Sequence, residues 1–441
     1  MVSKFAIIFH MNINIEEYLR NRNIELPNPR RYAFLMKLVS GWFNLRFHPE
    51  FIYHFDTAEM NGKPVVMLAD HAAWDSFYYV MCGYPFVQFN TVVGYHHIFN
   101  KTLFPILTNV FQVIPKKNFQ TDLGAMRHIV KVSEMGGSLL VFPEGTQSKS
   151  GSNVPLTPST SGLLKKLGLT VVLCKSYGSY CARPLYSGKT NRGHQEFHYE
   201  ILFTPEELKE MSKDKIYDRM LDRFRYNDLE WNREKKYPYH CKNGNAAGIE
   251  KIVYTCPRCG EQFTIHGEGD AVVCSSCGNR ILINEYYEMS PAGTTDICPY
   301  HNIDDWYKDE RRMIREKVKA PDFRLEFNCS LYELETETLS REPYKKTGYG
   351  RVTIDHGGIA YRGIRRNEPA EIKLDIKKVP SMLSTPGKFN LLYNKNEVYR
   401  LVPSENRNTV IRNMIVVEEL YNLTDPVWNK VSEDAYYNME K

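Results

Sequence analysis

The sequence lacks a long apolar stretch and a strong excess of either charge. No apolar run reaches the roughly 18–20 residues that a bilayer-spanning helix needs. Lys and Arg number 57 against 52 Asp and Glu, so the formal net charge is only +5 over 441 residues. This excess does not by itself indicate a nucleic-acid-binding surface. A charged fraction of 25% and a hydrophobic fraction of 42% exclude a disordered chain, a collagen and a simple coiled coil.

Cysteines are few and unevenly placed. Four of the ten form two CxxC pairs, and the other six are scattered. A secreted disulfide scaffold would be shorter and more evenly cross-linked. The short apolar core at residues 5–9 is soon followed by Glu16 and Glu17 without a small-residue cleavage site, which does not fit a secretory signal. We therefore expect a protein of the reducing cytoplasm.

The first 60 residues have a helical pattern. Residues 32–43 (YAFLMKLVSGWF) are apolar on nearly every side of a helix, and basic residues flank or interrupt them. A helix of this kind is either buried or lies at a membrane surface, and the pattern leaves both alternatives open. The basic residues are Arg30, Arg31, Lys37 and Arg46.

From residue 64 to about 235, apolar strand patterns alternate with helical ones. This alternation predicts an α/β domain whose sheet is covered on both faces. A polar helix beginning at Pro205 is expected to close the region. The predicted strands are residues 64–69, 86–93, 138–142, 170–174 and 196–203, and the other predicted helices are residues 74–81 and 122–135.

The remainder of the chain changes character twice. Two CxxC pairs follow a polar, loop-like stretch, and a strongly charged helix at 304–319 serves as a connector. Short strands with turn signals come next, and one amphipathic helix at 404–421 follows them. This last part resembles a pleckstrin-homology-type half-barrel in topology only. The predicted domains are residues 1–235, 236–290, 291–322 and 323–441.

The apolar run at 64–69 leads directly into Asp70-His71-Ala72-Ala73-Trp74-Asp75. A histidine where a strand gives way to a helix sits at the edge of an α/β sheet where ligands bind. If the helix begins at His71, Asp75 lies on the same face and can hold one ring nitrogen of the imidazole, which leaves the other free as a base. A capping aspartate beside a structural histidine is the alternative.

A second motif, Phe142-Pro-Glu-Gly-Thr-Gln-Ser148, also follows an apolar strand. FPEGT preceded by an upstream His…Asp resembles the lysophospholipid acyltransferase family, which includes the 1-acylglycerol-3-phosphate acyltransferases. The resemblance covers roughly residues 30–230. Three residues separate His71 from Asp75 where the family has four, Asp70 replaces the usual Asn, and Gln147 stands where Arg is common.

The resemblance implies a base-catalysed acyl transfer without a protein nucleophile. His71 is the implied base and Asp75 its orienting partner, with acyl-CoA or acyl carrier protein as the thioester donor. Lys116 and Lys117 are the implied cations for the phosphate of a lysophospholipid, with a solvated loop end as the alternative. The implied lining of the acceptor site is Glu144, Gly145 and Thr146.

Cys256-Pro-Arg-Cys259 and Cys274-Ser-Ser-Cys277 are separated by fourteen residues, and each pair is followed by glycine. This spacing predicts a four-thiolate zinc ribbon whose metal is structural, because four ligands fill the coordination sphere. The acidic neighbours Glu261, Glu268 and Asp270 argue against a phosphate-binding face, so we expect no nucleic-acid partner.

The sequence therefore predicts a cytoplasmic acyltransferase that is peripheral at the membrane and acylates a lysophospholipid, with 1-acylglycerol-3-phosphate as the default acceptor. Two alternatives remain: an acyltransferase for another hydroxyl acceptor, and a non-catalytic scaffold that binds a membrane or a partner.

Overall fold

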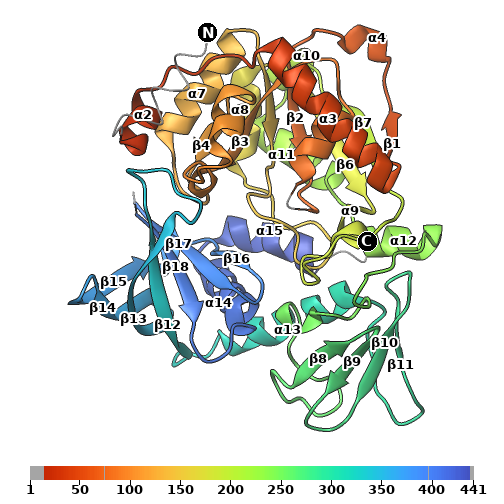
Figure 1. The fold of residues 1–441 in the computed structure, drawn as a ribbon, viewed down its shortest axis with the longest axis vertical. Helices are drawn as coiled ribbons and strands as arrows, with labels where there is room; N and C mark the ends of the chain where they lie inside the picture. Colours follow the sequence, from red (N-terminus) through yellow and green to blue (C-terminus); the bar gives the residue numbers. More distant parts are fainter. Residues whose placement is uncertain (1–13, 74, 396, 438–441) are drawn as a thin grey trace.

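The computed structural model describes residues 14–73, 75–395 and 397–437. Three sheets organise the chain: a seven-stranded mixed sheet, a four-stranded antiparallel sheet and a seven-stranded antiparallel sheet. The first lies in the upper half of Figure 1, and the other two lie side by side below it. The predicted fold class, a layered α/β domain followed by a zinc ribbon and a β-rich part with C-terminal helix, is confirmed.

The first sheet has the strand order β1-β7-β6-β2-β5-β3-β4. The five strands from β6 to β4 are parallel, whereas β1 and β7 form a parallel pair that runs the opposite way. The central strand β2 is fully buried, as its continuous apolar sequence predicts. The strands are β1 (Glu50–Tyr53), β2 (Val65–Ala69), β3 (Phe89–Gly94), β4 (Ile114–Lys116), β5 (Ser138–Val141), β6 (Thr170–Tyr177) and β7 (Glu196–Phe203).

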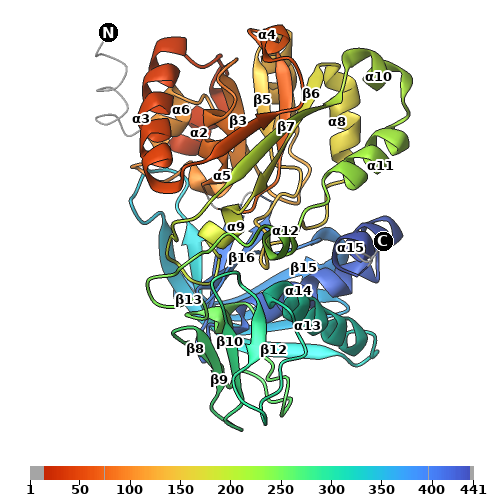
Figure 2. The same ribbon diagram turned by 90° about the vertical axis from the view of Figure 1, so that its right-hand side faces the viewer.

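Helices cover both faces of this sheet. Alternate side chains of β2 accordingly point into two separate cores. In Figure 2, α3 lies on one side of the strands, and α8, α10 and α11 lie on the other. The helices are α2 (Ile15–Asn21), α3 (Pro29–Phe47), α4 (Thr57–Met60), α5 (Ser76–Cys82), α6 (Phe104–Asn109), α7 (Leu123–Glu134), α8 (Ser159–Leu167), α9 (Ser179–Ala182), α10 (Pro205–Glu210), α11 (Lys213–Arg223) and α12 (Asp228–Lys235).

Two sequence expectations for this part were wrong. The single polar helix expected from Pro205 is three helices, because the side chains of Ser212 and Asn227 cap backbone amides and start new helices. The helical reading of the first 60 residues missed β1. Residues 1–13, including the apolar core considered as a secretory signal, lie outside the described residues.

The second sheet is a small meander of four strands, in the order β11-β10-β9-β8. The stretch before it, expected to be a polar loop, contains the fully buried Ala246, Ile249 and Ile252. It therefore belongs to the core. The strands are β8 (Ile265–Glu268), β9 (Ala271–Cys274), β10 (Arg280–Ile283) and β11 (Met289–Pro291).

Helix α13 (Ile303–Lys317), expected as a strongly charged connector, is largely buried. Trp306 and Arg311 are inaccessible to solvent. Arg311 donates to Glu418 at 2.6 Å and to Glu419 at 2.8 Å, which compensates its buried charge. Arg311 and Arg315 of its charged pattern pair with α14 (Thr409–Asn422), whereas Arg312 and Glu316 are exposed.

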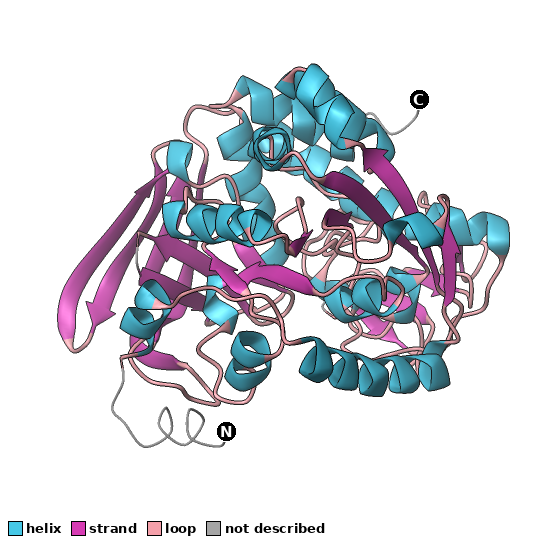
Figure 3. Ribbon diagram, turned by 90° about the horizontal axis from the view of Figure 1, so that it is seen from above, coloured by secondary structure: helices cyan, strands magenta, loops and turns pink. Residues whose placement is uncertain are grey.

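The third sheet has the order β15-β14-β13-β12-β18-β17-β16. Its first strands are long and not short as expected, and in Figure 3 they project to one side of the molecule. A second terminal helix, α15 (Pro426–Tyr436), follows the one predicted. The strands are β12 (Arg324–Leu334), β13 (Tyr344–Asp355), β14 (Gly358–Arg365), β15 (Glu368–Asp375), β16 (Leu383–Thr385), β17 (Phe389–Asn394) and β18 (Glu397–Pro403).

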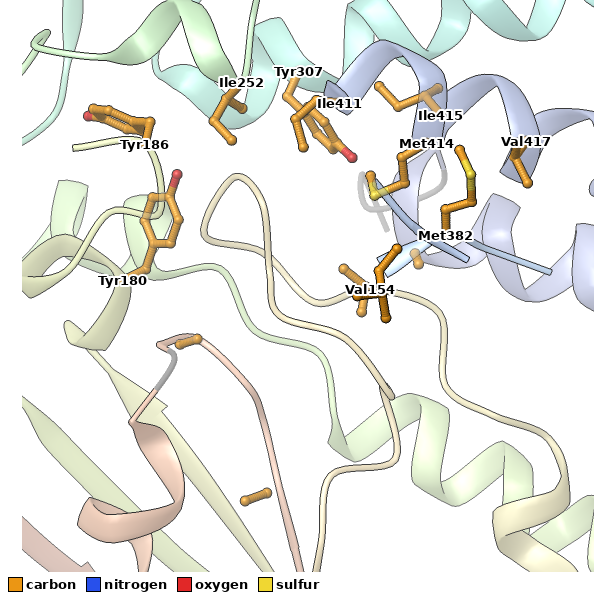
Figure 4. Close-up of a cluster of buried hydrophobic side chains, with 14 of the residues drawn as sticks. Val154, Tyr180, Tyr186, Ile252, Tyr307, Met382, Ile411, Met414, Ile415 and Val417 are labelled. Carbon is orange, nitrogen blue, oxygen red and sulfur yellow. The ribbon is translucent and has the colours of Figure 1, made fainter. Parts of the chain in front are cut away.

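The three sheets share one hydrophobic core. Figure 4 shows Val154 of the first part beside Met382 and below Met414 of α14, with Tyr180 and Tyr186 on the side of Ile252. The domain boundaries predicted at 235, 290 and 322 therefore stay predictions, since the core is continuous across them.

Candidate active site and metal centre

The two sequence motifs meet at one edge of the first sheet. His71 follows β2, and the FPEGT segment follows β5, which pairs with β2 in parallel. Lys116 ends β4, farther along the same row of parallel strands. Because the carboxyl ends of parallel strands lie at one edge, all three segments border the place where α/β sheets bind ligands.

Glu144 joins the motifs through the backbone. One of its carboxylate oxygens accepts the His71 N–H at 2.8 Å, and the other accepts the Val154 N–H at 3.0 Å. The Ser148 N–H also donates to the His71 carbonyl at 3.0 Å. Burial raises the pKa of Glu144 to about 8, while the two amide donors oppose the rise. Glu144 thus ties the FPEGT loop to the His71 segment through one oxygen and to the Val154 segment through the other.

The imidazole of His71 is free to act as a base. Its Nδ1 atom is buried and has no hydrogen-bond partner among the described residues, and its ring lies 4.7 Å from that of Phe142. Burial, and then the nearby ammonium of Lys149, lower the pKa of His71 to about 4. The ring is therefore neutral at pH 7 and can accept a proton.

The structure does not bring Asp75 to His71. Asp75 forms an ion pair with Nε of Arg183 at 3.1 Å, and the Tyr79 hydroxyl donates to its other oxygen. Helix α5 begins at Ser76, so Asp75 precedes the helix and the assumed same-face geometry with His71 does not arise. The guanidinium of Arg183 also lies over the rings of Phe47 and Tyr79.

A cation that the sequence analysis missed, Lys149, lies beside the FPEGT loop. Its side chain is buried, and its Nζ donates to Oγ1 of Thr146 at 3.2 Å. Burial lowers the pKa of Lys149 to about 8, against the attraction of Glu418 and Glu144. The sequence did hold a clue to Lys149. The resembled family commonly has a cationic Arg at the position of Gln147, and Lys149 follows that position by two residues.

Lys116 and Lys117 lie next to this loop at the end of β4. Lys116 is partly buried, which lowers its pKa, and its Nζ donates to the Lys117 carbonyl at 3.3 Å. The following residue, Asn118, donates from Nδ2 to the Gly145 carbonyl at 2.7 Å. Gly145 has φ of +67°, a conformation that favours glycine.

A small cavity separates the FPEGT loop from the C-terminal helices. Phe119, Glu144 and Thr146 line one side, and Glu418, Trp428 and Tyr436 line the other. Its volume of about 20 Å³ has room for roughly one water molecule.

The four cysteines of the two CxxC pairs converge on one point. Sγ of Cys256 lies 3.7 Å from that of Cys277, and Sγ of Cys259 lies 3.8 Å from that of Cys274. Tetrahedral Zn–S bonds of about 2.3 Å place sulfurs about 3.8 Å apart. In each pair the following glycine donates its N–H to the first cysteine carbonyl at 2.9 Å, which closes the turn. The donor set therefore fits a structural zinc ion.

Two family models match separate parts of the chain. Residues 49–174 match the family model described as acyltransferase. Residues 249–285 match a zinc-ribbon model described as DNA-directed RNA polymerase, 7 kDa subunit. The first match defines the class: residues 49–174 form an acyltransferase-family domain. The chain joins this domain to a zinc ribbon in one polypeptide.

One solved structure with similarity is the 1-acyl-sn-glycerophosphate (LPA) acyltransferase PlsC from Thermotoga maritima. It shares 12% sequence identity at a TM-score of 0.38, and the match covers 53% of this chain and 92% of that one. This similarity is too low to carry an argument about function. No curated protein matches the sequence significantly.

Proposed function

We propose that this protein transfers a fatty acyl group from acyl-CoA or acyl carrier protein to the hydroxyl of a lysophospholipid, with 1-acylglycerol-3-phosphate as acceptor, in phospholipid synthesis. The observation that carries the proposal is His71: its imidazole is neutral and has no hydrogen-bond partner at Nδ1 among the described residues, and Glu144 accepts its backbone N–H and so holds this residue beside the FPEGT loop.

The chemistry requires one base. The acceptor hydroxyl attacks the thioester carbonyl while His71 takes its proton, so that an O–C bond forms as the C–S bond breaks. The proton then passes from His71 to the departing thiolate. Lys149, with Lys116 and Lys117, supplies cations for the acceptor phosphate. Glu144 positions His71, and Gly145 and Thr146 border the acceptor site.

The lipid substrates call for a membrane contact, and α3 supports one. Phe34, Leu38, Trp42 and Leu45 are exposed along one side of this helix. The exposed Arg30, Arg31 and Lys37 accompany this stripe, a combination suited to an anionic lipid surface. We propose peripheral binding on the cytoplasmic side through this stripe; no helix among the described residues is long and apolar enough to cross a bilayer. We propose no nucleic-acid partner, since Glu261, Glu268 and Asp270 flank the zinc knuckles.

The test is the replacement His71→Ala. We expect acyl transfer from a thioester to a lysophospholipid to fall by about 10²–10⁴-fold, the usual contribution of a general base. Turnover of the wild-type protein should stay near its maximum as the pH falls from 7 to 5, because His71 becomes protonated only near its pKa of about 4.

His128→Ala is the matched control, because His128 lies on α7 away from both motifs, and it should keep wild-type turnover. Unchanged turnover in His71→Ala would overturn the assignment of the base. No turnover of any thioester by the wild-type protein would favour the scaffold alternative, and a panel of hydroxyl acceptors separates the default acceptor from others.

A further inference from the structure

A cluster of histidine and glutamate side chains lies at the edge of the first sheet, apart from both sites described above. Glu50 begins β1 and Glu196 begins β7, and the two are directly paired across these parallel strands. His194 precedes β7 by two residues. His54 and His198 complete the group.

The three central side chains converge closely. Nε2 of His194 lies 3.3 Å from a carboxylate oxygen of Glu196 and 3.7 Å from one of Glu50. One atom from each residue forms a set in which all distances are within 4.8 Å. Nε2 of His194 is buried and makes no hydrogen bond to any described residue. A ring nitrogen thus faces two carboxylates without the geometry of a hydrogen-bond donor.

The two carboxylates of the cluster give it a negative charge that favours a cation. Like charges directly opposite each other on neighbouring strands repel. The side chain of Glu196 is only 8% exposed, and a buried carboxylate requires a partner charge or a metal. No lysine or arginine of the described residues forms an ion pair with Glu50 or Glu196.

The surrounding histidines fix the orientation of Glu196. Its second oxygen lies 2.9 Å from Nε2 of His198, whose Nδ1 lies 3.2 Å from Nε2 of His54. In the tautomers that fit this chain, His54 donates to His198 and His198 donates to Glu196. Such outer hydrogen bonds commonly orient the carboxylate ligands of metals. They leave the first oxygen of Glu196 free for a metal.

We propose that Glu50, His194 and Glu196 bind a second divalent metal ion of the Zn²⁺ type. With metal–ligand bonds of about 2.0–2.2 Å, tetrahedral ligand atoms stand about 3.3–3.6 Å apart. The two distances from His194 agree with this spacing to within a few tenths of an ångström. One imidazole and two carboxylates suit Zn²⁺, and three protein ligands leave a fourth position for water.

The site differs from the zinc ribbon in chemistry and access. It has nitrogen and oxygen donors instead of thiolates, and the side chain of Glu50 is 58% exposed, so the ion exchanges with solvent. The metal links β1 to β7, the two strands that run against the rest of the first sheet. The metal therefore stabilises the pairing of these two edge strands in the acyltransferase-family domain.

The experiment is equilibrium dialysis of the zinc-loaded full-length protein against Zn²⁺, with metal counted by mass spectrometry. We expect two zinc ions per chain, one from the ribbon and one from this cluster. Co²⁺ added to protein that keeps its ribbon zinc should give visible d–d absorption without a thiolate charge-transfer band.

Glu50→Gln and His194→Ala should return the count to one, and His198→Ala should weaken the second ion by about 10–100-fold. His266→Ala is the matched control: His266 pairs with Glu268 at 2.9 Å on the surface and forms no ion pair with a second glutamate among the described residues, so the count should stay at two. A count of one in the wild type at saturating Zn²⁺, or a second ion that survives both Glu50→Gln and His194→Ala, would overturn the proposal. Because Glu50 is exposed, its variant keeps the test decisive even if His194→Ala fails to fold.

Discussion

At the scale of single residues, the position of Asp75 decides what its replacement does. Its carboxylate and the guanidinium of Arg183 are 7% and 3% exposed, so each charge depends on the other. Leaving one buried charge without its partner costs about 3–5 kcal/mol. The structure therefore gives Asp75 a role in stability.

We predict that Asp75→Asn lowers the free energy of unfolding by about 3–5 kcal/mol, because it leaves Arg183 buried and unpaired. Urea unfolding followed by circular dichroism measures the change. The double replacement Asp75→Leu with Arg183→Met should recover part of the loss. A stable Asp75→Asn protein with strongly reduced acyl transfer would instead assign Asp75 to the orientation of His71.

Sequence reasoning located the motifs at this scale but not their contacts. A histidine after a buried strand and FPEGT after another imply a common sheet edge, and both segments lie there. The contact between His71 and Asp75 was inferred from helical spacing, and that inference failed because the helix begins one residue after Asp75. The approach of Glu144 to the His71 amide spans 73 residues, and no local pattern encodes it.

At the scale of elements, α3 shows why its sequence left two alternatives. Successive residues of a helix point about 100° apart, so the neighbours Trp42 and Phe43 face different surroundings. Trp42 is 51% exposed, whereas Phe43 is inaccessible and stacks on Tyr79 with ring centroids 4.0 Å apart. The buried reading is confirmed for the face that carries Phe43, and the membrane-surface reading stays a prediction for the exposed face that carries Trp42.

We predict that Trp42→Ser and Phe43→Ser act differently. Trp42→Ser should weaken sedimentation with anionic liposomes and leave thermal stability nearly unchanged. Phe43→Ser should cost about 3–5 kcal/mol of unfolding free energy, the range for deleting a buried aromatic ring. Leu123→Ser, at an exposed apolar position on α7, is the control and should bind liposomes like the wild type. Equal liposome binding by Trp42→Ser and the wild type would contradict the proposed membrane face.

Strands of the first sheet were predictable because burial on both faces leaves a continuous apolar run. Residues 138–142 and 170–174 show this pattern, and β5 and β6 begin at the predicted residues. Strand β1 was missed because it is four residues long and none of its residues is fully buried. Edge strands of this kind carry little hydrophobic signal.

At the scale of the whole molecule, the zinc ribbon is hydrogen-bonded to helix α13 of the C-terminal half. The Thr255 carbonyl accepts from the Trp306 indole at 3.1 Å. A carboxylate oxygen of Glu310 accepts the Tyr254 and Thr255 amides at 2.7 and 2.6 Å. The residues that precede Cys256 are thereby held by α13.

We predict one zinc bound by the four cysteines, and that its removal unfolds the region around residues 250–285. Metal binding and folding are coupled in small metal units, since the thiolates repel without the ion. Hydrogen exchange after chelation should show lost protection there and also in the first turns of α13. Protein purified without chelator that lacks thiolate-bound zinc would contradict the prediction, and Cys329→Ser, outside the ribbon, is the control.

The sequence predicted the order of the α/β part, the zinc ribbon and the β-rich part along the chain, but not the contacts between them. Apolar positions of α14 are visible in the sequence, yet nothing local says that α13 covers some of them and that the FPEGT side of the molecule approaches others. The buried pairs of Arg311 with Glu418 and Glu419 resembled solvated charges because each pair joins residues more than a hundred positions apart.

The cavity between the FPEGT loop and the C-terminal helices is too small for the substrates of the proposed reaction. Sites for molecules of drug size measure about 300–1,000 Å³, and a lysophospholipid with its acyl chain needs at least as much. The cavity of about 20 Å³ admits neither donor nor acceptor at Thr146. Glu418 of α14 and Trp428 and Tyr436 of α15 line this cavity opposite the FPEGT loop, so these two helices cover the loop at Thr146. Binding of a lysophospholipid at Thr146, as the proposed function requires, therefore demands that α14 and α15 first move away from the FPEGT loop.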